Sequence, residues 1–151
     1  GFSITRDNVE AFAHDFEQVT RDRIPGDGLL QTVEIDAIVA LTEVDSALIA
    51  ALEHLQPFGH GNPSPVLCTM NATPLYNSVR VFKDRHLRFA VRQGPNQLTA
   101  IGFNMNDRTE AVALSRSVDL VFTPKLNTFR GETTIQLHLK DVRPAQSGAS
   151  C

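Results

Sequence analysis

The first quarter of the chain carries apolar side chains at helical spacing. In residues 7–24 they form one stripe, made of Val9, Phe12, Ala13, Phe16 and Val19. Steps of three and four residues predict an amphipathic helix. Asp7 followed by Glu10 predicts a capping box at its start, and the Pro25, Gly26, Asp27, Gly28 run predicts its end.

Residues 31–41 alternate with a period of two, which predicts a strand with one largely polar face. Its apolar face would carry Val33, Ile35, Ala37, Val39 and Leu41. A second helical stripe follows, made of Val44, Leu48, Ala51, Leu52 and Leu55. Thr42 is its predicted N-cap, with Asp45 placed to complete the capping box, and Pro57 ends it.

Two glycines and two prolines in residues 59–65 predict a rigid connector. We expect Phe58 to anchor this connector and Gly59 and Gly61 to adopt positive φ angles. The period of two then returns and predicts strands near 66–82, 86–93, 97–104, 117–126 and 133–142, with a short helix near 108–115. Hairpin turns are expected at 94–96 and 129–131.

Five strands with a helix between the third and fourth define the order of an OB-fold barrel. Leu87, Phe89 and Val91 would point inward, with His86, Arg88, Ala90 and Arg92 outward; Val118, Leu120 and Phe122 also alternate, as do Ile135, Leu137 and Leu139. The expected fold class is α+β, with a five-stranded OB-fold barrel preceded by a partial α/β segment and a connecting helix. The expected domains are residues 1–30, a strand–helix connector at 31–65, the barrel at 66–145 and a tail at 146–151.

Charge is divided unevenly between the two halves of the chain. Residues 1–65 hold eleven acidic and three basic residues, and residues 66–151 hold eleven basic and six acidic residues. The net charge of −3 therefore combines about −8 in the first part with about +5 in the second. A basic barrel beside an acidic segment favours a polyanion, single-stranded nucleic acid above all, as its partner.

The candidate nucleic-acid-binding residues are seven cations and one aromatic ring. They are Arg80, Lys83, Arg85, Arg88 and Arg92 on the first two barrel strands, and Lys125, Phe129 and Arg130 near a hairpin tip. Cations would follow phosphates and Phe129 would stack on a base, with Tyr76 and Phe82 as further stacking candidates. Two other interpretations stay open: a solvated basic surface, and a Phe129 ring tucked into the barrel end.

Residues with a catalytic or metal-binding pattern are not evident. The five histidines lie on separate predicted elements and none has metal-ligand spacing with a carboxylate. Cys68 and Cys151 form neither a disulfide framework nor a zinc motif. No apolar run reaches the roughly 20 residues of a membrane span. We therefore expect no catalytic residue, metal or cofactor in this chain, no membrane association and a reducing, cytoplasmic location.

The run from Leu55 to Val66, LQPFGHGNPSPV, resembles a signature of RecJ-type single-stranded-DNA-specific exonucleases between their DHHA1 region and their OB-fold. Residues 1–4, 33–36, 86–88, 100–104 and 129–137 resemble neighbouring segments of that family. The resemblance implies the C-terminal part of such an enzyme, whose DHH core carries out 5′→3′ hydrolysis of single-stranded DNA with Mn²⁺ or Mg²⁺. It also implies roles in DNA repair and recombination, and single-stranded-DNA-binding protein as a partner.

The sequence departs from the family pattern at one point: the DHH motif and the glycine–histidine motif that should precede Gly1 are absent. No catalytic residue or metal ligand is carried over, and the chain alone is expected to be inactive, with the DHH core acting in cis. Within these limits we expect a single-strand-binding module. The alternative is a protein-interaction OB module that docks an acidic partner tail without touching DNA.

Overall fold

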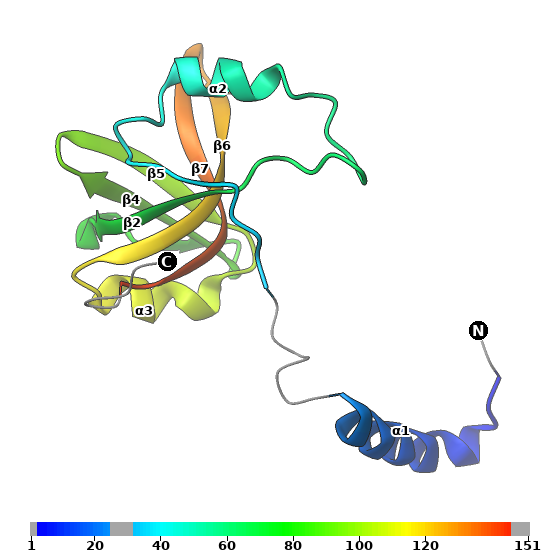
Figure 1. Cartoon of the computed structure of the whole chain (residues 1–151). Coiled ribbons are helices and arrows are strands. Elements are labelled where there is room, and N and C mark those ends of the chain that lie inside the picture. The colour runs from blue at the N-terminus through cyan, green and yellow to red at the C-terminus, as the bar shows by residue number, and fades with distance from the viewer. Residues whose placement is uncertain (1–2, 25–31, 146–151) are drawn as a thin grey trace. The chain divides into compact units, whose positions relative to one another are not determined.

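The structure is a computed structural model that describes residues 3–24 and 32–145. The chain separates into two compact units, residues 1–33 and residues 34–151. In the first unit a short 3-10 turn, Arg6–Asn8, leads into helix α1, Val9–Arg23 (Figure 1). Within the described residues, the second unit holds the strands β1 to β7 and the helices α2 and α3.

Helix α1 confirms the predicted helix but not its predicted cap. Asn8 occupies the N-cap position and makes no side-chain capping bond, and Asp7, the predicted cap, lies within the preceding 3-10 turn. Val9, Phe16 and Val19 remain exposed, and the Phe12 and Phe16 rings stack with centroids 5.6 Å apart. The run 25–28, predicted to end the helix, lies outside the described residues.

The strand predicted at 31–41 is wrong in extent. Only β1, Ala37–Ile38, is a strand, and it runs parallel to the first two residues of β2, Leu67–Pro74. Asp36 N donates to Val66 O at 2.8 Å and Val66 N donates to Asp36 Oδ2 at 2.8 Å. The pairing continues to Val39, whose N donates to Cys68 O at 2.8 Å, but it does not extend back to Val33 and Ile35, which stay exposed despite their alternation.

Helix α2, Ser46–Glu53, begins later than predicted. Asp45, not Thr42, is the N-cap, and its carboxylate accepts from Leu48 N at 2.8 Å. Residues 41–44 instead form a turn in which Leu41 and Val44 enter the core. An aspartate in the β region just before a helix satisfies the free N–H groups better than a threonine three residues away.

The connector after α2 is held by its own hydrogen bonds. Asn62 Nδ2 donates to Leu55 O at 2.8 Å and to Pro57 O at 3.0 Å, and Gly59 pairs with Asn62. Phe58 is half-buried. The predicted positive φ at Gly59 and Gly61 is wrong: the turn closes through the backbone pairing of Gly59 with Asn62 without a left-handed glycine.

Five strands close into a ring, which confirms the α+β fold class and the OB-type barrel. Its strands are β2, β4 (His86–Gln93), β5 (Asn96–Gly102), β6 (Val118–Phe129) and β7 (Glu132–Pro144). Their order is β2–β6–β7–β5–β4, and a short β2–β4 pairing at Thr73 and Pro74 closes the ring. The β5–β7 pairing is parallel, and the others in the ring are antiparallel.

The long first strand predicted at 66–82 is divided. After β2 the chain forms a 3-10 turn, Tyr76–Ser78, and then the three-residue edge strand β3, Arg80–Phe82, which pairs with β4. The Ser78 hydroxyl donates to Leu75 O at 2.5 Å and accepts from Ala90 N at 2.7 Å. Between β2 and β3 the Ser78 hydroxyl takes the place of a backbone partner for Ala90 of β4, so the strand pairing is interrupted there.

The barrel interior follows the predicted alternation. Leu87, Phe89 and Val91 of β4 are fully buried, together with Val118, Leu120, Phe122 and Leu137. Helix α3, Thr109–Leu114, follows a 3-10 turn at Asn106–Arg108 and contributes Val112 to the same core. Figure 1 shows α3 at the opposite end of the barrel from α2. On β4 inward residues alternate with outward ones, so its outer face is free to carry function, whereas β2 and β6 each begin with three consecutive buried residues.

A buried carboxylate holds the bend that lets β2 pair with two strands. The β2–β6 register shifts between Thr69 and Ala72, where Asn71 has a φ of 56°. Asp119, only 3% exposed, accepts from Asn71 N at 3.1 Å and from Arg143 Nε at 3.3 Å. The bulge therefore depends on an acceptor that arrives from β6.

Replacing Asp119 by alanine should lower the free energy of unfolding by about 1–3 kcal/mol, because the Asn71 N–H and Arg143 both lose a buried acceptor. Urea unfolding followed by circular dichroism measures the change. Asp107→Ala is the matched control, since Asp107 is exposed and 3.6 Å from Arg108. Equal losses in both variants would show that the bulge does not depend on Asp119.

Candidate nucleic-acid interface

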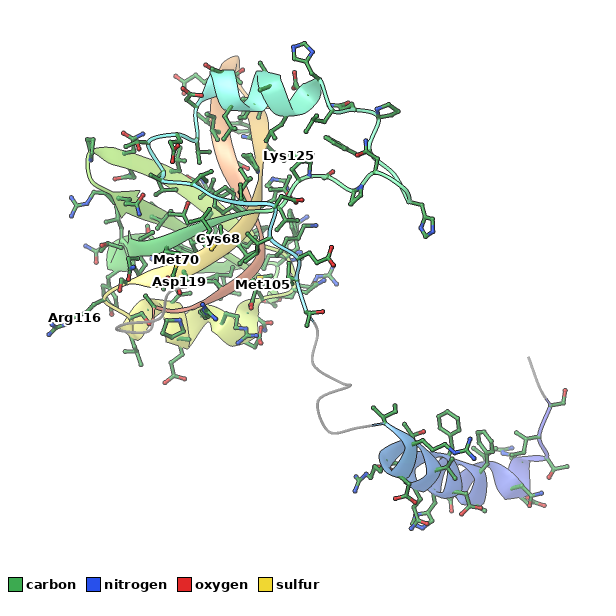
Figure 2. The ribbon with its side chains drawn as sticks, in the orientation of Figure 1. Cys68, Met70, Met105, Arg116, Asp119 and Lys125 are labelled. Atoms are coloured by element: carbon green, nitrogen blue, oxygen red, sulfur yellow. The ribbon has the colours of Figure 1, made fainter. Side chains whose placement is uncertain are left out.

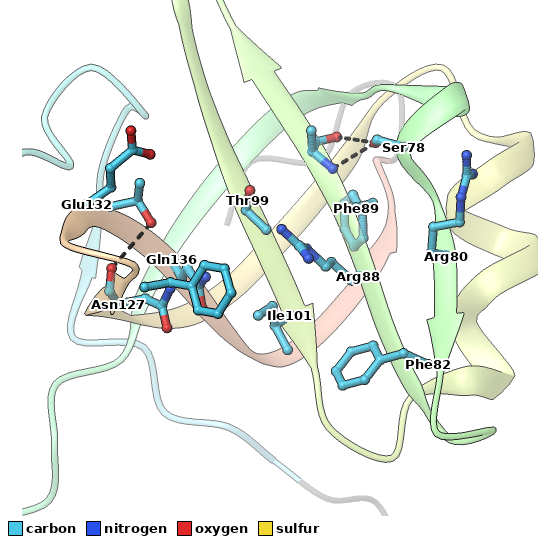
Figure 3. Close-up of a pocket in the computed structure, with 13 residues that line it drawn as sticks. Ser78, Arg80, Phe82, Arg88, Phe89, Thr99, Ile101, Asn127, Glu132 and Gln136 are labelled. Carbon is cyan, nitrogen blue, oxygen red and sulfur yellow. Dashed lines mark hydrogen bonds between the residues drawn. The ribbon is translucent and has the colours of Figure 1, made fainter.

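An open groove of about 870 Å³ crosses the outer face of the barrel. Its floor comes from β4 and β5, and its two sides come from β3 and from the β6–β7 hairpin (Figure 3). The lining residues are mostly neutral or basic: Ser78, Arg80, Phe82, Arg88, Phe89, Ala90, Thr99, Ile101, Asn127, Phe129, Glu132, Thr134 and Gln136. A long, open shape of this kind suits an extended chain rather than a compact ligand.

Strand register explains why these side chains share one face. Arg80 lies opposite Arg88, Arg88 lies opposite Ile101, and Ile101 lies opposite His138. Directly opposed residues point to the same side of a sheet. Figure 3 shows the Arg88 side chain extending over the groove floor.

The Arg80–Arg88 pair concentrates positive charge at one side of the groove. Like charges directly opposite each other destabilise a sheet, and here no carboxylate offsets them. Within the described part of the chain, none of the seven candidate cations forms an ion pair, whereas Arg21, Arg108 and Arg143 do. An incoming anion would relieve this repulsion.

Phe129 lies on the other side of the groove from the two arginines. Its ring is 66% exposed, so it is not tucked into the barrel end. Arg130 lies over this ring, with its Cζ 5.2 Å from the ring centroid. Arg130 and Gly131 both have positive φ, which gives the tight hairpin that presents the ring.

The remaining predicted residues are spread more widely. Lys83 and Arg85 lie at the β3–β4 turn, and Arg92 lies opposite Gln97 near the point of ring closure, outside the groove lining. Lys125 lies opposite Gln136, which does line the groove. The structure therefore brings together Arg80, Arg88 and Phe129.

Charge alone could not identify the neutral part of the groove. Thr99, Asn127, Thr134 and Gln136 are polar lining residues that sequence reasoning missed, and Glu132 adds one acidic group. For Asn127, Thr134 and Gln136 the signal was the polar side of β6 and β7, and for Thr99 it was the polar side of β5. These residues line one groove only because β7 pairs with β5.

Four aromatic side chains form a strip beside this groove. The ring centroids are 5.1 Å apart for Phe82 and His86, 5.3 Å for His86 and Phe103, and 5.5 Å for Phe103 and His138. His86 was predicted to point outward into solvent but is only 9% exposed, because the phenylalanine rings on either side cover it. Sequence reasoning also missed Phe103 and His138 as members of this strip.

Burial lowers the pKa of His138 below its ordinary value of 6.5, and the positive charges of Lys125 and Lys140 lower it further. Two cations therefore lie close enough to this imidazole to disfavour its protonation.

In the described residues, no three histidine, cysteine, aspartate or glutamate side chains are grouped so that they could hold a metal ion. The described helices include none that is long and apolar enough to cross a membrane.

The ring order, the helix between β5 and β6, and the groove over β4 and β5 define this part of the chain as an OB-fold domain. A family model described as the RecJ OB domain matches residues 35–141. The chain belongs to the RecJ OB domain family.

Relatives and solved structures agree with this assignment. The chain is 22% identical over 143 residues to the single-stranded-DNA-specific exonuclease RecJ of Bacillus subtilis, covering 93% of this chain and 18% of that protein. It is 24% identical over 147 residues to the RecJ of Haemophilus influenzae, covering 95% and 25%. The chain thus spans about a fifth to a quarter of the length of these curated relatives. RecJ from Thermus thermophilus in complex with Mn²⁺ superposes with a TM-score of 0.70 at 21% identity, covering 97% of this chain and 21% of that one.

The lowered pKa of His138 predicts how stability depends on pH. As pH falls through 6.5, the unfolded chain binds a proton at residue 138 before the folded protein does, so the free energy of unfolding decreases. His138→Gln should therefore lose less stability than the unsubstituted chain between about pH 7.5 and pH 5.5. Chemical unfolding at each pH measures this, with His60→Gln, on the exposed connector, as control. Parallel pH profiles for His138→Gln and the unsubstituted chain would contradict the prediction.

Proposed function

We propose that this chain is the single-stranded-DNA-holding part of a RecJ-like exonuclease that acts 5′→3′ in DNA repair and recombination. The observation that carries the proposal is the opposed Arg80–Arg88 pair in a groove whose other side presents the exposed Phe129 ring. Cations for phosphates and a ring for a base are the two elements of non-specific single-strand binding. Membership of the RecJ OB domain family supports it.

The groove suits a flexible single strand better than a duplex. In a single strand, successive bases can turn toward an aromatic ring while phosphates turn toward guanidinium groups. Arg80 and Arg88 would bind phosphate, and Phe129 would stack. Lys83, Arg85, Arg92, Lys125 and Arg130 would add a surrounding positive potential that raises the rate of encounter.

The parent protein would supply the chemistry. Its Mn²⁺ or Mg²⁺ would be held by a DHH core that acts in cis, as the metals named with the Thermus thermophilus RecJ structures suggest. The described residues of this chain provide no metal-ligand set, so its share of the work is to hold and orient the strand. Single-stranded-DNA-binding protein is the proposed protein partner.

Charge reversal at Arg88 should weaken binding of a labelled oligothymidylate by about tenfold or more at low salt, because a phosphate contact becomes a repulsion. The slope of log K against log salt should shrink by about 0.7 for the lost contact. Fluorescence anisotropy across a salt series measures both. Arg116→Glu is the matched control, because Arg116 is exposed and lies outside the groove lining (Figure 2).

The same titrations decide between this function and a protein-interaction module. If Arg88→Glu and Arg116→Glu bind DNA equally, the groove is not the DNA site. If the unsubstituted chain binds an acidic peptide but not DNA, the protein-interaction module is the better description.

The isolated chain should release no nucleotides from single-stranded DNA in the presence of Mn²⁺, because the metal-holding core is expected elsewhere in the parent protein. Incubation of an end-labelled oligonucleotide, resolved on a denaturing gel, tests this. Release of mononucleotides in Mn²⁺ that is abolished by a chelator would refute the proposed division of labour.

A further inference from the structure

The aromatic strip continues the groove rather than standing apart from it. Phe82 belongs to both, and His138 lies opposite the groove residue Ile101. Arg80, Arg88 and Ile101 lie side by side across β3, β4 and β5. Two residues further along the same strands, Phe82, His86 and Phe103 lie side by side in the same way. A single DNA strand that lies along the groove would therefore meet the aromatic strip where β4 begins and β5 ends.

Phe103 is the ring of this strip that faces solvent and is also held in place. It is 50% exposed, and it packs nearly edge to face with His86 and His138, at interplanar angles of 72° and 71°. Imidazoles on two sides fix its orientation. A ring that is already fixed loses little conformational entropy when a second ring stacks on it.

The backbone around Phe103 is fixed as well. Asn104 N donates to His86 Nδ1 at 3.0 Å, and Asn106 N donates to Arg85 O at 3.3 Å. Met105 packs so closely on Gly102 that a Cβ there would lie 2.7 Å from the Met105 sulfur. The turn after β5 therefore presents the Phe103 ring from a rigid support.

Positive charge accompanies the ring. Lys125 lies opposite Gln136, two residues from His138 along β7, and the charges of Lys125 and Lys140 both act on His138, whose ring packs on Phe103. An exposed ring beside two free ammonium groups suits a nucleobase joined to phosphates. An apolar protein surface would instead leave these ammonium groups without partners as it covered the ring.

We propose that Phe103 is a second base-stacking subsite for single-stranded DNA, where the aromatic strip continues the groove past Phe82, with Lys125 and Lys140 neutralising the adjoining phosphates. This inference rests on the proposed function and extends it. The Phe129 ring would then hold one base at the hairpin side of the groove, and the Phe103 ring would hold another at the aromatic strip.

The first test uses the full chain and a 15-nucleotide oligothymidylate, with two companion probes that carry abasic nucleotides at the 5′ end or at the 3′ end. Phe103→Leu keeps an apolar side chain but removes the ring, and should weaken binding of the fully based probe about fivefold or more. Phe103→Tyr, which keeps an aromatic ring, should bind the fully based probe as tightly as the unsubstituted chain does. On one of the abasic probes, Phe103→Leu and the unsubstituted chain should bind equally.

A second measurement reports on the ring directly. The chain contains no tryptophan, so Phe103→Trp has a single indole whose fluorescence should be quenched by the oligothymidylate and less so by one abasic probe. Phe16→Trp, on the exposed face of α1, is the control and should not be quenched.

If the oligothymidylate binds but Phe103→Leu retains full affinity and Phe103→Trp is not quenched, the second subsite is overturned while the proposed function stands. If the unsubstituted chain binds no oligothymidylate, both fail together.

Discussion

Closure of the five-stranded ring is the constraint on which the rest of this structure depends. The strand β2 must pair with β6 along one stretch and with β4 along the next, and it does so by bulging at Asn71. The buried Asp119 carboxylate satisfies the amide that this bulge exposes. Closure then separates the two faces of every strand, because inward residues fill the core and outward residues meet across neighbouring strands. Arg88 and Ile101 are already partners in the β4–β5 hairpin, whereas Gln136 joins them only because β7 pairs with β5 in the ring.

The same geometry accounts for the electrostatics of the outer face. Arginines on β3 and β4 are forced into direct opposition, and the nearest lining carboxylate, Glu132, comes from the hairpin on the other side of the groove. Where an acidic partner is present, as at Asp119 and Arg143, the barrel uses it for structure. Cations left unpaired on a folded surface retain their full attraction for a phosphate, and this attraction is most effective at low salt.

Sequence pattern predicted the barrel well because alternation is a local property of strands that are buried on one face. It predicted β4 at its observed bounds, His86–Gln93, and the helix between β5 and β6. It failed at β1, where alternation alone could not reveal that only two residues find a partner. At α2 it took Thr42 as the N-cap and Asp45 as the acid that completes the capping box, whereas Asp45 is itself the N-cap. Within the groove, Arg80 and Arg88 could be paired from one hairpin, whereas Gln136 and Phe103 required knowledge of which distant strands adjoin.

The parallel pairing of β5 with β7 has a consequence for synthesis of the protein on the ribosome. β7 is the last strand of the ring to be translated, and it pairs with both β6 and β5. Until it leaves the exit tunnel, β5 and β6 each lack a neighbour, and Phe89 and Phe122 cannot be enclosed. The nascent chain must therefore carry an incomplete, apolar half-barrel until its final strand emerges, an interval in which chaperone binding would protect it from association with other chains.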